Sequence, residues 1–302
     1  MEIRCGPTRR RGEGRVTASP PVLKESALAL ARVALRSFLT TGCILDCRPA
    51  GPARVSVLLL VCNRAELTLT CLQALALRLH QAPCEIIIVD NGSTDETGRL
   101  LERVRGVQVI RNEVNLGFPR AINQAARLAG GDHLLLLNND AQVMGRSIDV
   151  AAAFLDTHAD VGAVGGKVLL LDGTLQEAGV TVFRDGWTSQ LGRGAAADDP
   201  AYDFPRDVTY CSGAFLMTPR ELFAQLGGLD EAFSPGYFED TDYGIRLWQA
   251  GRRVVYLPDV AILHFENATS SSLADLTGLV QRNHRLFTAK HAAWLRTRPM
   301  RT

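Results

Sequence analysis

The sequence lacks a long apolar run. No stretch reaches the roughly 18 consecutive apolar residues that a membrane-spanning helix requires. The most apolar segment near the start, residues 23–39, is interrupted by four charged residues, which are Lys24, Glu25, Arg32 and Arg36. This spacing is typical of an amphipathic helix. The sequence therefore predicts a helix that lies on a surface and not one that crosses a bilayer.

Several signature motifs are also missing. None of the seven cysteines forms a Cys-x-x-Cys pair, and no zinc-type His/Cys spacing appears, so reduced, buried thiols in a cytosolic protein are expected. The first apolar run is followed by Cys62-Asn63-Arg64 in place of a Gly-x-Gly-x-x-Gly loop. No phosphate-binding P-loop and no Gly-x-Ser-x-Gly turn occurs. These absences argue against dinucleotide-binding, P-loop and serine-hydrolase classes.

Basic residues are scarce in the body of the chain. The 302 residues have a net charge of +1, but residues 1–54 carry +6 and residues 279–302 carry +6. Residues 55–278, between them, carry −11. A nucleic-acid-binding core needs a basic face, so no nucleic acid partner is expected. The basic ends either contact an anionic membrane surface or are simply solvated. We expect a cytoplasmic protein, and contact with the inner face of the membrane stays one of these two alternatives.

The sequence does contain a regular alternation of strand-like and helical segments. Continuous apolar runs at residues 55–62, 85–89 and 133–137 are typical of buried parallel strands. Helical spacing appears beside them at residues 65–79 and 119–129. Short connections between such elements imply right-handed βαβ units. We predict an α/β fold with a mainly parallel twisted sheet and flanking helices.

The second half of the chain departs from this rhythm and predicts a smaller antiparallel portion. The Gly- and Asp-rich stretch 172–207 is expected to be irregular and partly antiparallel. Further helices are expected at 219–226, 242–250 and 273–295, and strands at 254–257 and 260–263. We divide the chain into a basic N-terminal extension (1–53), a main domain (54–292) and a basic tail (293–302).

Asn138-Asn139-Asp140 follows the third apolar run. A hard divalent cation bound together with a diphosphate needs one or two oxygen ligands from protein, and phosphate and water supply the rest. Asp140 supplies a carboxylate, and Asn138, two residues away on an extended chain, points to the same side. The same tripeptide is good turn chemistry, so by itself the motif leaves a simple turn open.

Asp90 ends the second apolar run. Residues 93–96 resemble a helix N-cap with acids in the first turn, but capping does not explain Asp90. Ligands bind at the carboxyl ends of the strands in open α/β sheets. Asp90 is therefore a candidate to hydrogen-bond a base or a ribose.

Three carboxylates lie within four residues, at Glu239, Asp240 and Asp242. Each raises the pKa of the others, which suits one of them to general-base work. The alternative is a solvated turn. His264 follows the last apolar run, where a lone His is more often a satisfied core or surface residue than a ligand.

Taken in order, these motifs resemble the family 2 glycosyltransferases of GT-A fold, and within them the rhamnosyltransferase-like branch. The resemblance covers residues 54–292. Its blocks are Val55 to Arg64, Val89 to Asp95, Asn115 to Phe118, Leu137 to Asp140, Ser212 to Ala214, Gly227 to Glu231, Phe238 to Asp242, and His264.

The resemblance implies roles for these residues. Asp140 would hold Mg²⁺ or Mn²⁺ through the diphosphate, with His264 as a further ligand. Asp240 would be the catalytic base, with Glu239 and Asp242 positioning acceptor or base. The nucleotide-binding residues it implies are Asn63, Arg64, Asp90, Asn91, Asn115, Gly117, Asn138 and Asn139.

The implied reaction is an inverting transfer in one displacement step. The donor would be a dTDP-, UDP- or GDP-linked sugar, with rhamnose as one candidate, and the acceptor a hydroxyl of a glycan or lipid-linked glycan. Three residues depart from the family pattern: Asn138 stands where Asp is usual, Cys62 where Tyr is usual and Pro119 where a small residue is usual. The donor pocket is therefore expected to differ in shape.

Two other classes stay open. One is a non-catalytic sugar-nucleotide-binding or scaffold protein on the same fold, against which the intact Asp140, Asp240 and His264 argue. The other is a nucleotidyltransferase, which would open with a Gly-rich basic loop where Asn63-Arg64 stands. The Gln-x-x-Arg-Trp motif of processive synthases is missing, which disfavours a polysaccharide synthase of that type.

Overall fold

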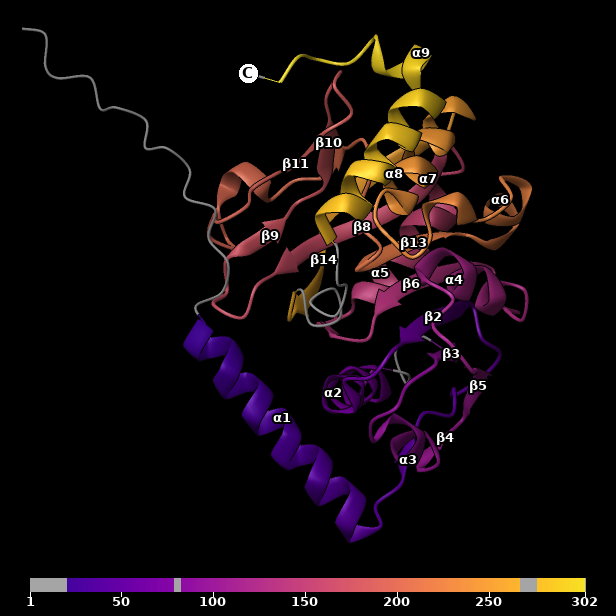
Figure 1. Ribbon diagram of the computed structural model, residues 1–302, viewed down its shortest axis with the longest axis vertical. Helices are drawn as coiled ribbons and strands as arrows, with labels where there is room; N and C mark the ends of the chain where they lie inside the picture. The colour runs from indigo at the N-terminus through magenta and orange to yellow at the C-terminus, as the bar shows by residue number, and fades with distance from the viewer. Residues whose placement is uncertain (1–20, 79–82, 267–275, 302) are drawn as a thin grey trace, which may run out of the picture.

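A central sheet organises the computed structural model, which describes residues 21–78, 83–266 and 276–301. One half of the sheet is parallel and has the strand order β6-β2-β3-β5 (Figure 1). Its strands are β2 (Val55–Val61), β3 (Cys84–Asn91), β5 (Val107–Asn112) and β6 (His133–Asn138). The apolar runs thus form the buried parallel strands that the sequence predicts, and the α/β prediction is confirmed.

The other half of the sheet is mixed in direction. β13 (Phe215–Pro219) lies antiparallel between β6 and β8 (Val161–Leu169). β14 (Arg253–His264) runs parallel to β8, and β12 (Arg206–Asp207) is antiparallel to β14 at the edge. The two strands expected at 254–257 and 260–263 are one strand with a register shift between Leu257 and Ala261.

Short antiparallel strands lie beside the mixed half. β9 (Leu175–Glu177) pairs with β8 and β7 (Ala141–Val143) with β14, whereas β10 (Val180–Val182) and β11 (Thr188–Gln190) form a separate two-stranded sheet. β9, β10 and β11 confirm the antiparallel excursion expected at residues 172–207. β1 (Leu45–Asp46) and β4 (Val104–Arg105) form a separate parallel pair.

Helices cover both faces of the sheet, giving three layers (Figure 1). Alternate strand residues face opposite ways: Val57 and Leu59 join the core under α2 and α5, whereas Leu58 packs with Ala121 and Ile122 of α4. The first face carries α2 (Ala65–Ala76), α3 (Thr97–Leu101) and α5 (Ser147–Thr157). The second carries α4 (Phe118–Ala126), α6 (Arg220–Gln225) and α7 (Glu239–Gln249).

The N-terminal segment packs against the first of these faces. α1 (Pro21–Thr41) lies along the outer side of α2, at the left of Figure 1. Its Leu35 and Leu39 and the following Cys47 belong to the main core. Within the residues that the structure describes, no helix has the length and apolar character needed to span a membrane.

The C-terminal helices cover the opposite end of the molecule. α8 (Leu276–Lys290) and α9 (Ala292–Leu295) pack on an aromatic cluster that includes Phe233, Phe238 and Phe287. Two single turns, η1 (Pro200–Tyr202) and η2 (Glu231–Phe233), complete the elements of the described residues. The boundaries predicted at residues 53 and 292 stay predictions, although α1, β1 and α9 all pack on the main body.

Candidate active site

The loops after β2 and β3 are locked together by Asn63. Asn63 and Arg64 both adopt left-handed backbone conformations, with φ of 61° and 62°, which is uncommon outside glycine. The Asn63 side-chain Oδ1 accepts hydrogen bonds from the amides of Thr94 (2.8 Å) and Asp95 (3.2 Å). The Asn63 amide donates to Ser93 Oγ at 2.8 Å. The expected nucleotide residues Asn63 and Arg64 therefore stand at the carboxyl end of β2, beside the loop of Asp90.

Asp90 and Asn91 end β3 in different environments. Asp90 is 7% exposed and accepts a hydrogen bond from the Ser93 amide at 3.1 Å. Asn91 is fully buried; its Nδ2 donates to Asn115 Oδ1 at 2.8 Å, and its Oδ1 accepts from the Leu116 amide at 3.1 Å. Asn91 thus supports the loop of Asn115 from below, so Asp90 is better placed than Asn91 to meet a ligand.

The Asn115 loop leads into α4. Asn115 Oδ1 accepts from the Gly117 amide at 2.9 Å, and Gly117 has φ of +85°. A Cβ at Gly117 would lie 2.6 Å from Pro235 Cα, so only glycine permits this approach. The Phe118 amide donates to Pro235 O at 2.7 Å. The expected donor loop therefore touches the segment that precedes Glu239 and Asp240.

Asp140 and His264 come together from strands far apart in the sequence. His264 Nε2 lies 3.1 Å from Asp140 Oδ1 and 3.3 Å from Asn138 Nδ2. Both Asp140 and His264 are nearly inaccessible, at 7% and 6% exposed. Burial works to lower the pKa of His264, but the neighbouring Asp140 carboxylate and other acids outweigh it, so the pKa is raised.

Gln176, a residue the sequence reasoning missed, holds the other side of this imidazole. Its Oε1 lies 2.8 Å from His264 Nδ1, and the contact is buried. An Nδ1–H that donates to Gln176 leaves Nε2 directed at Asp140. Asn139 turns away instead, and its Nδ2 donates to Thr68 Oγ1 at 3.0 Å in the interior.

The chemistry of these side chains fits a divalent cation bound together with a diphosphate. One carboxylate, one oriented imidazole and the nearby Asn138 amide supply a small set of protein ligands, and the phosphates and water would complete the shell. A preformed cage is not seen: no group of three or more His, Cys, Asp or Glu side chains in the described part of the chain is arranged to hold a metal.

Glu239 and Asp240 stand in the first turn of α7. The two residues before them, Tyr237 and Phe238, have φ of 72° and 73°, and such strain in bulky residues concentrates at functional sites. Asp240 Oδ2 accepts from the Gly213 amide at 3.2 Å and Oδ1 from the Thr241 amide at 2.7 Å. Burial raises the pKa of Asp240 above its ordinary value despite these hydrogen bonds.

The pKa of Glu239 is also raised. Burial, together with the adjacent Asp240 carboxylate, raises the pKa of Glu239 to about 8. Its Oε2 is buried, with no hydrogen-bond partner among the described residues. A protonated Glu239 beside an ionised Asp240 is the arrangement that these environments favour.

Asp242 lies apart from this pair. It is fully buried, and its carboxylate binds three cationic or polar groups: Arg246 Nε at 2.7 Å, Lys290 Nζ at 2.6 Å and His291 Nε2 at 2.7 Å. These contacts anchor the C-terminal helices to α7. The expected role of Asp242 in positioning acceptor or base stays a prediction, and its contacts favour a structural role.

A short bridge joins the Asp140 side of the site to the Asp240 side. The backbone amide of Asn138 donates to Ala214 O at 3.3 Å, and the backbone amide of Gly213 donates to the Asp240 carboxylate. Glu177, next to Gln176, accepts from the Ser212 amide at 3.1 Å, and burial raises its pKa. Neither Gln176 nor Glu177 stood out in the sequence, because nothing local distinguishes them from other polar residues in a Gly- and Asp-rich stretch.

Comparison with known proteins shows the family to which the chain belongs. Residues 56–227 match the sequence profile of Glycosyl transferase family 2. The chain is 29% identical over 297 residues to the O-antigen biosynthesis protein RfbC of Myxococcus xanthus, covering 94% of this chain and 23% of that protein. It is 28% identical over 246 residues to the N-acetylglucosaminyl-diphospho-decaprenol L-rhamnosyltransferase of Mycobacterium tuberculosis (strain ATCC 25618 / H37Rv), covering 73% and 80%.

Solved structures share the fold at low sequence identity. GalNAc-T7, crystallised with UDP, GalNAc and Mn²⁺, aligns with a TM-score of 0.60 and 17% identity over 78% of this chain and 48% of that one. The mannosyltransferase PcManGT of Pyrobaculum calidifontis, in complex with GDP-Man and Mn²⁺, aligns with a TM-score of 0.54 and 18% identity over 90% and 75%. The GT-A fold expected from the sequence is thereby confirmed.

Proposed function

The chain belongs to glycosyl transferase family 2, and from this premise we propose that it moves a sugar from a nucleotide-diphosphate donor to a hydroxyl of a glycan or lipid-linked glycan. The relatives named for O-antigen biosynthesis and for L-rhamnosyl transfer support a surface glycan as product and rhamnose as the first sugar to test. Because the chain spans only 23% of the Myxococcus relative, the activity of that whole protein is not carried over.

The observation that carries the proposal is the bridge of residues 212–214 between two chemically different carboxylates. Asp140, with His264 beside it, lies at the carboxyl end of the parallel strands, where nucleotide diphosphates bind in such sheets. Asp240 stands at the other end of the bridge with a raised pKa. A base whose pKa is moved towards neutrality is suited to take a proton from an alcohol.

We propose that Asp90, Asn63 and Arg64 bind the nucleoside, and that the Asn115–Gly117 loop borders the sugar. Asp240 takes the proton of the acceptor hydroxyl as its oxygen attacks the anomeric carbon. The bond between that carbon and the diphosphate oxygen breaks with its electron pair, so the nucleoside diphosphate leaves and the anomeric configuration inverts. Glu239 is protonated and therefore neutral, so it places no second negative charge beside Asp240.

Asp140 and His264 are the residues we propose to hold Mg²⁺ or Mn²⁺, with Asn138 nearby. The bound cation would neutralise charge on the leaving diphosphate. Structures of two proteins with the same fold contain Mn²⁺ with UDP or GDP-mannose, which supports this choice. A lipid-linked acceptor would bring the enzyme to the inner face of the cytoplasmic membrane, and we propose this location for it.

A thermal-shift panel tests the donor and metal together. UDP, dTDP, GDP and CDP are each added with Mn²⁺ or with EDTA. A nucleotide at 100 times its dissociation constant adds about 2.7 kcal/mol to stability. We expect one nucleotide to stabilise the protein only with Mn²⁺, and Asp140→Ala to abolish that shift. If no nucleotide stabilises the protein under either condition, donor binding at this site is contradicted.

Asp240→Asn tests the base. It keeps the shape of the side chain and one oxygen that accepts from the Gly213 or the Thr241 amide, but it does not take up a proton. We expect turnover to fall roughly 10²–10⁴-fold while the nucleotide-dependent thermal shift is retained. Unchanged turnover in Asp240→Asn would show that another residue is the base. Wild-type protein that shows the nucleotide-dependent thermal shift but no glycosyl transfer would favour a scaffold protein.

A further inference from the structure

α1 is apolar on two faces, but the described structure covers only one of them. The inner face packs on α2 and the core through Ala31, Leu35 and Leu39, which are 6–7% exposed. The outer face carries Val22, Leu30 and Val33, which are 73%, 72% and 62% exposed. Large apolar side chains on an exposed helix face indicate a surface that meets a partner or a membrane. The outer face of α1 therefore lacks a partner in the described structure.

The outer residues form one continuous stripe. Positions 22, 26, 29, 30, 33 and 37 follow the three- and four-residue spacing that places side chains on the same side of a helix. Between Val22 and Val33 the stripe also holds the small residues Ser26 and Ala29, and Ser37 continues it by one more turn. The three large apolar residues thus span about three turns of α1, which runs along the edge of the molecule in Figure 1.

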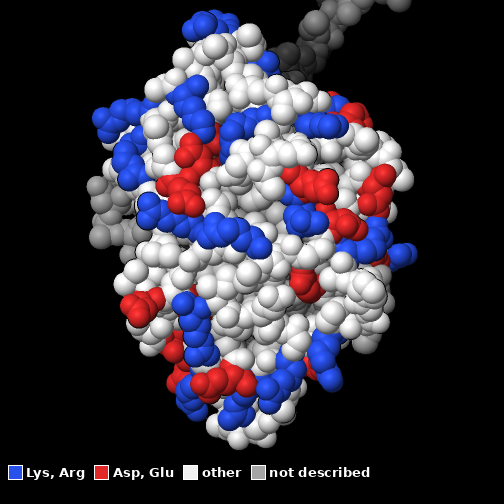
Figure 2. Space-filling view, turned by 90° about the vertical axis from the view of Figure 1, so that its right-hand side faces the viewer, with Lys and Arg blue, Asp and Glu red and all other residues white. Residues whose placement is uncertain are grey.

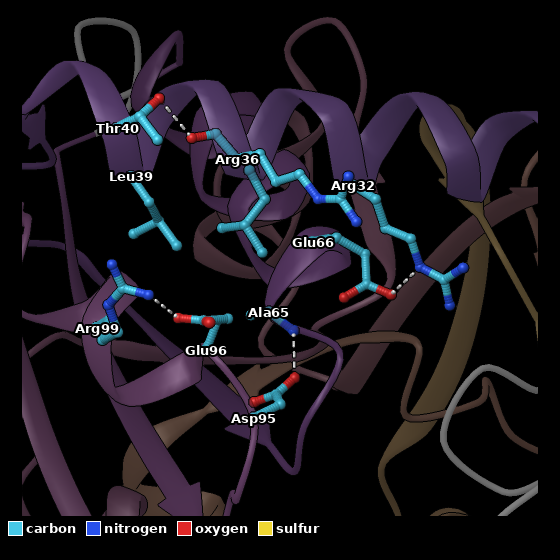
Figure 3. Close-up of a pocket in the computed structure, with 10 residues that line it drawn as sticks. Arg32, Arg36, Leu39, Thr40, Ala65, Glu66, Asp95, Glu96 and Arg99 are labelled. Atoms are coloured by element: carbon cyan, nitrogen blue, oxygen red, sulfur yellow. Dashed lines mark hydrogen bonds and ion pairs between the residues drawn. The ribbon is translucent and has the colours of Figure 1, made fainter.

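The stripe has a basic edge. Arg32 and Arg36 project from α1 on one side of it, over a cavity of about 380 Å³ that Arg99 and the acids Glu66, Asp95 and Glu96 also line (Figure 3). Arg99 pairs with Glu96, and Arg32 pairs with Glu66 at 3.7 Å while its side chain stays 54% exposed. By contrast, the side of the molecule at the right of Figure 1 shows Lys and Arg interspersed with Asp and Glu (Figure 2).

Charge along the chain selects an anionic surface as the occupant. α1 carries three basic residues (Lys24, Arg32 and Arg36) and one acid (Glu25), a net charge of +2, whereas residues 55–278 carry −11. An anionic bilayer attracts the first segment and repels the acidic body, so it would orient the protein with α1 towards the lipid. Residues 1–20 themselves contain five arginines but only Met1, Ile3 and Val16 as large aliphatic residues, which are too few to cover the stripe.

We propose that the outer face of α1 docks on an anionic phospholipid bilayer. The stripe of Val22, Leu30 and Val33 would enter the interface, and Arg32 and Arg36 would pair with lipid phosphates. This inference rests on the lipid-linked acceptor of the proposed function. It also explains the position of the site, because Lys24 Nζ in the first turns of α1 donates to Glu266 O at 3.2 Å, two residues after His264.

The basic C-terminal helix is a poorer docking surface than the sequence suggests. Arg282 of α8 donates to the carbonyl of Ser234, and Lys290 is bound to Asp230 and Asp242. These cations face the protein and stabilise the loop before Asp240. Membrane contact, expected at the basic ends of the chain, is therefore assigned to α1 and not to α8.

Vesicle co-sedimentation tests the proposal with the full chain. Wild-type protein is mixed with vesicles of phosphatidylglycerol and phosphatidylcholine, or of phosphatidylcholine alone. We expect binding to the anionic vesicles that weakens with salt. Leu30→Ser/Val33→Ser should reduce the partition coefficient at least about tenfold, and Arg36→Gln should reduce it several-fold on anionic vesicles only.

A matched double variant controls for general loss of surface hydrophobicity. Leu128→Ser/Leu286→Ser replaces exposed apolar residues of the α4 end and of α8, and it should bind as the wild type does. Equal binding of Leu30→Ser/Val33→Ser and wild type overturns the proposal. So does a wild-type dimer in light scattering that Leu30→Ser/Val33→Ser dissociates while vesicles bind neither protein, since α1 would then pair with a second copy.

The nucleotide thermal-shift panel separates this inference from the proposed function. Leu30→Ser/Val33→Ser should keep the nucleotide-dependent shift, because α1's outer face touches no residue of the nucleotide site. Vesicle binding without any nucleotide-dependent shift in the wild type would leave the docking surface standing and contradict the glycosyl-transfer proposal. A nucleotide-dependent thermal shift without vesicle binding would contradict the docking surface and leave the glycosyl-transfer proposal standing.

Discussion

Gln176 decides how His264 presents its ring. The two residues are 88 positions apart in the sequence, and Gln176 Oε1 holds His264 Nδ1 at 2.8 Å. Such a partner fixes the tautomer and direction of a metal-binding imidazole, and losing it typically costs 10–100-fold in metal affinity. In the proposed metal site Gln176 would act on the cation through His264, which makes it a positioning residue.

We predict that Gln176→Leu lowers Mn²⁺ affinity by roughly 10–100-fold, measured by calorimetry on protein saturated with the nucleotide that the thermal-shift panel identifies. Gln176→Glu, which keeps an oxygen acceptor for Nδ1–H, should retain most of the affinity. Gln190→Leu, a nearby polar position on β11 that does not contact His264, is the control. Equal Mn²⁺ binding by Gln176→Leu and wild type would remove this role.

The raised pKa of Glu239 predicts that the stability of the protein decreases as the pH rises. Its pKa is raised from an ordinary value of 4.5 to about 8, chiefly by burial and then by Asp240. Between these values the folded protein holds a proton that the unfolded chain has lost, so stability decreases as pH rises from 4.5 to 8 and levels off above. The slope is at most about 1.4 kcal/mol per pH unit for this group.

Glu239→Gln removes this titration while keeping the shape of the protonated carboxyl. We predict that its melting temperature falls less than that of the wild type between pH 6 and pH 9, with the two proteins most alike at the acid end. Glu221→Gln, at the exposed start of α6, should follow the wild type throughout. Parallel curves for Glu239→Gln and wild type would show that Glu239 titrates normally.

At the scale of elements, α8 holds the loop before α7 in place through hydrogen bonds from Asn283. Asn283 is fully buried, and its Nδ2 lies 2.8 Å from Phe233 O, 2.8 Å from Gly236 O and 3.0 Å from Tyr237 O. It holds the backbone just where Tyr237 and Phe238 adopt left-handed conformations. The first turn of α7, with Glu239 and Asp240, takes its direction from this loop.

We predict that Asn283→Leu lowers the free energy of unfolding by at least about 2 kcal/mol, because it leaves buried carbonyls without a donor. Arg285→Leu, on the exposed side of the same helix, should change it by no more than about 0.5 kcal/mol. Urea denaturation of the two variants and the wild type measures the difference. If both variants have the same free energy of unfolding, the hydrogen bonds of Asn283 do not stabilise the protein.

At the scale of the whole molecule, the residues proposed to bind the nucleotide follow strands of the parallel half of the sheet. His264 ends β14 of the mixed half, and Asp240 stands in α7. The two halves meet where Gly117 lies against Pro235, with the Phe118 amide bonded to Pro235 O. A site that needs both halves depends on this approach. The backbone has no room there for a side chain.

We predict that Gly117→Ala weakens nucleotide-dependent stabilisation at least tenfold in apparent affinity and lowers the melting temperature. Gly227→Ala is a matched control, because Gly227 has a similar φ of +80° but open space around its Cβ position. The control isolates the backbone strain of an L-residue, about 1 kcal/mol or more, from the contact with Pro235. Identical behaviour of the two variants would mean that the contact between the halves is unimportant.

Part of this arrangement was predictable from the sequence and part was not. The apolar runs ending in Asp90 and Asp140 predicted two parallel strands and the edge at which their polar residues meet. β8 and β13 were not predicted, because the glycines of Val161–Leu169 break the apolar pattern and β13 is a short run between turns. Asp242 looked like Asp240 in the sequence, but its partners Lys290 and His291 lie about 50 residues away.

The sequence by itself determined the fold class, the family resemblance and the edge of the sheet that carries the chemistry, because strand periodicity and motif order are local properties. Only the tertiary structure decided which polar residues meet there. Hydrogen bonds such as Gln176 to His264, or Asn283 to the loop of Phe233, join residues whose separation no local pattern records. The same holds for α1, whose two apolar faces look alike in sequence until packing buries one and leaves the other for a partner.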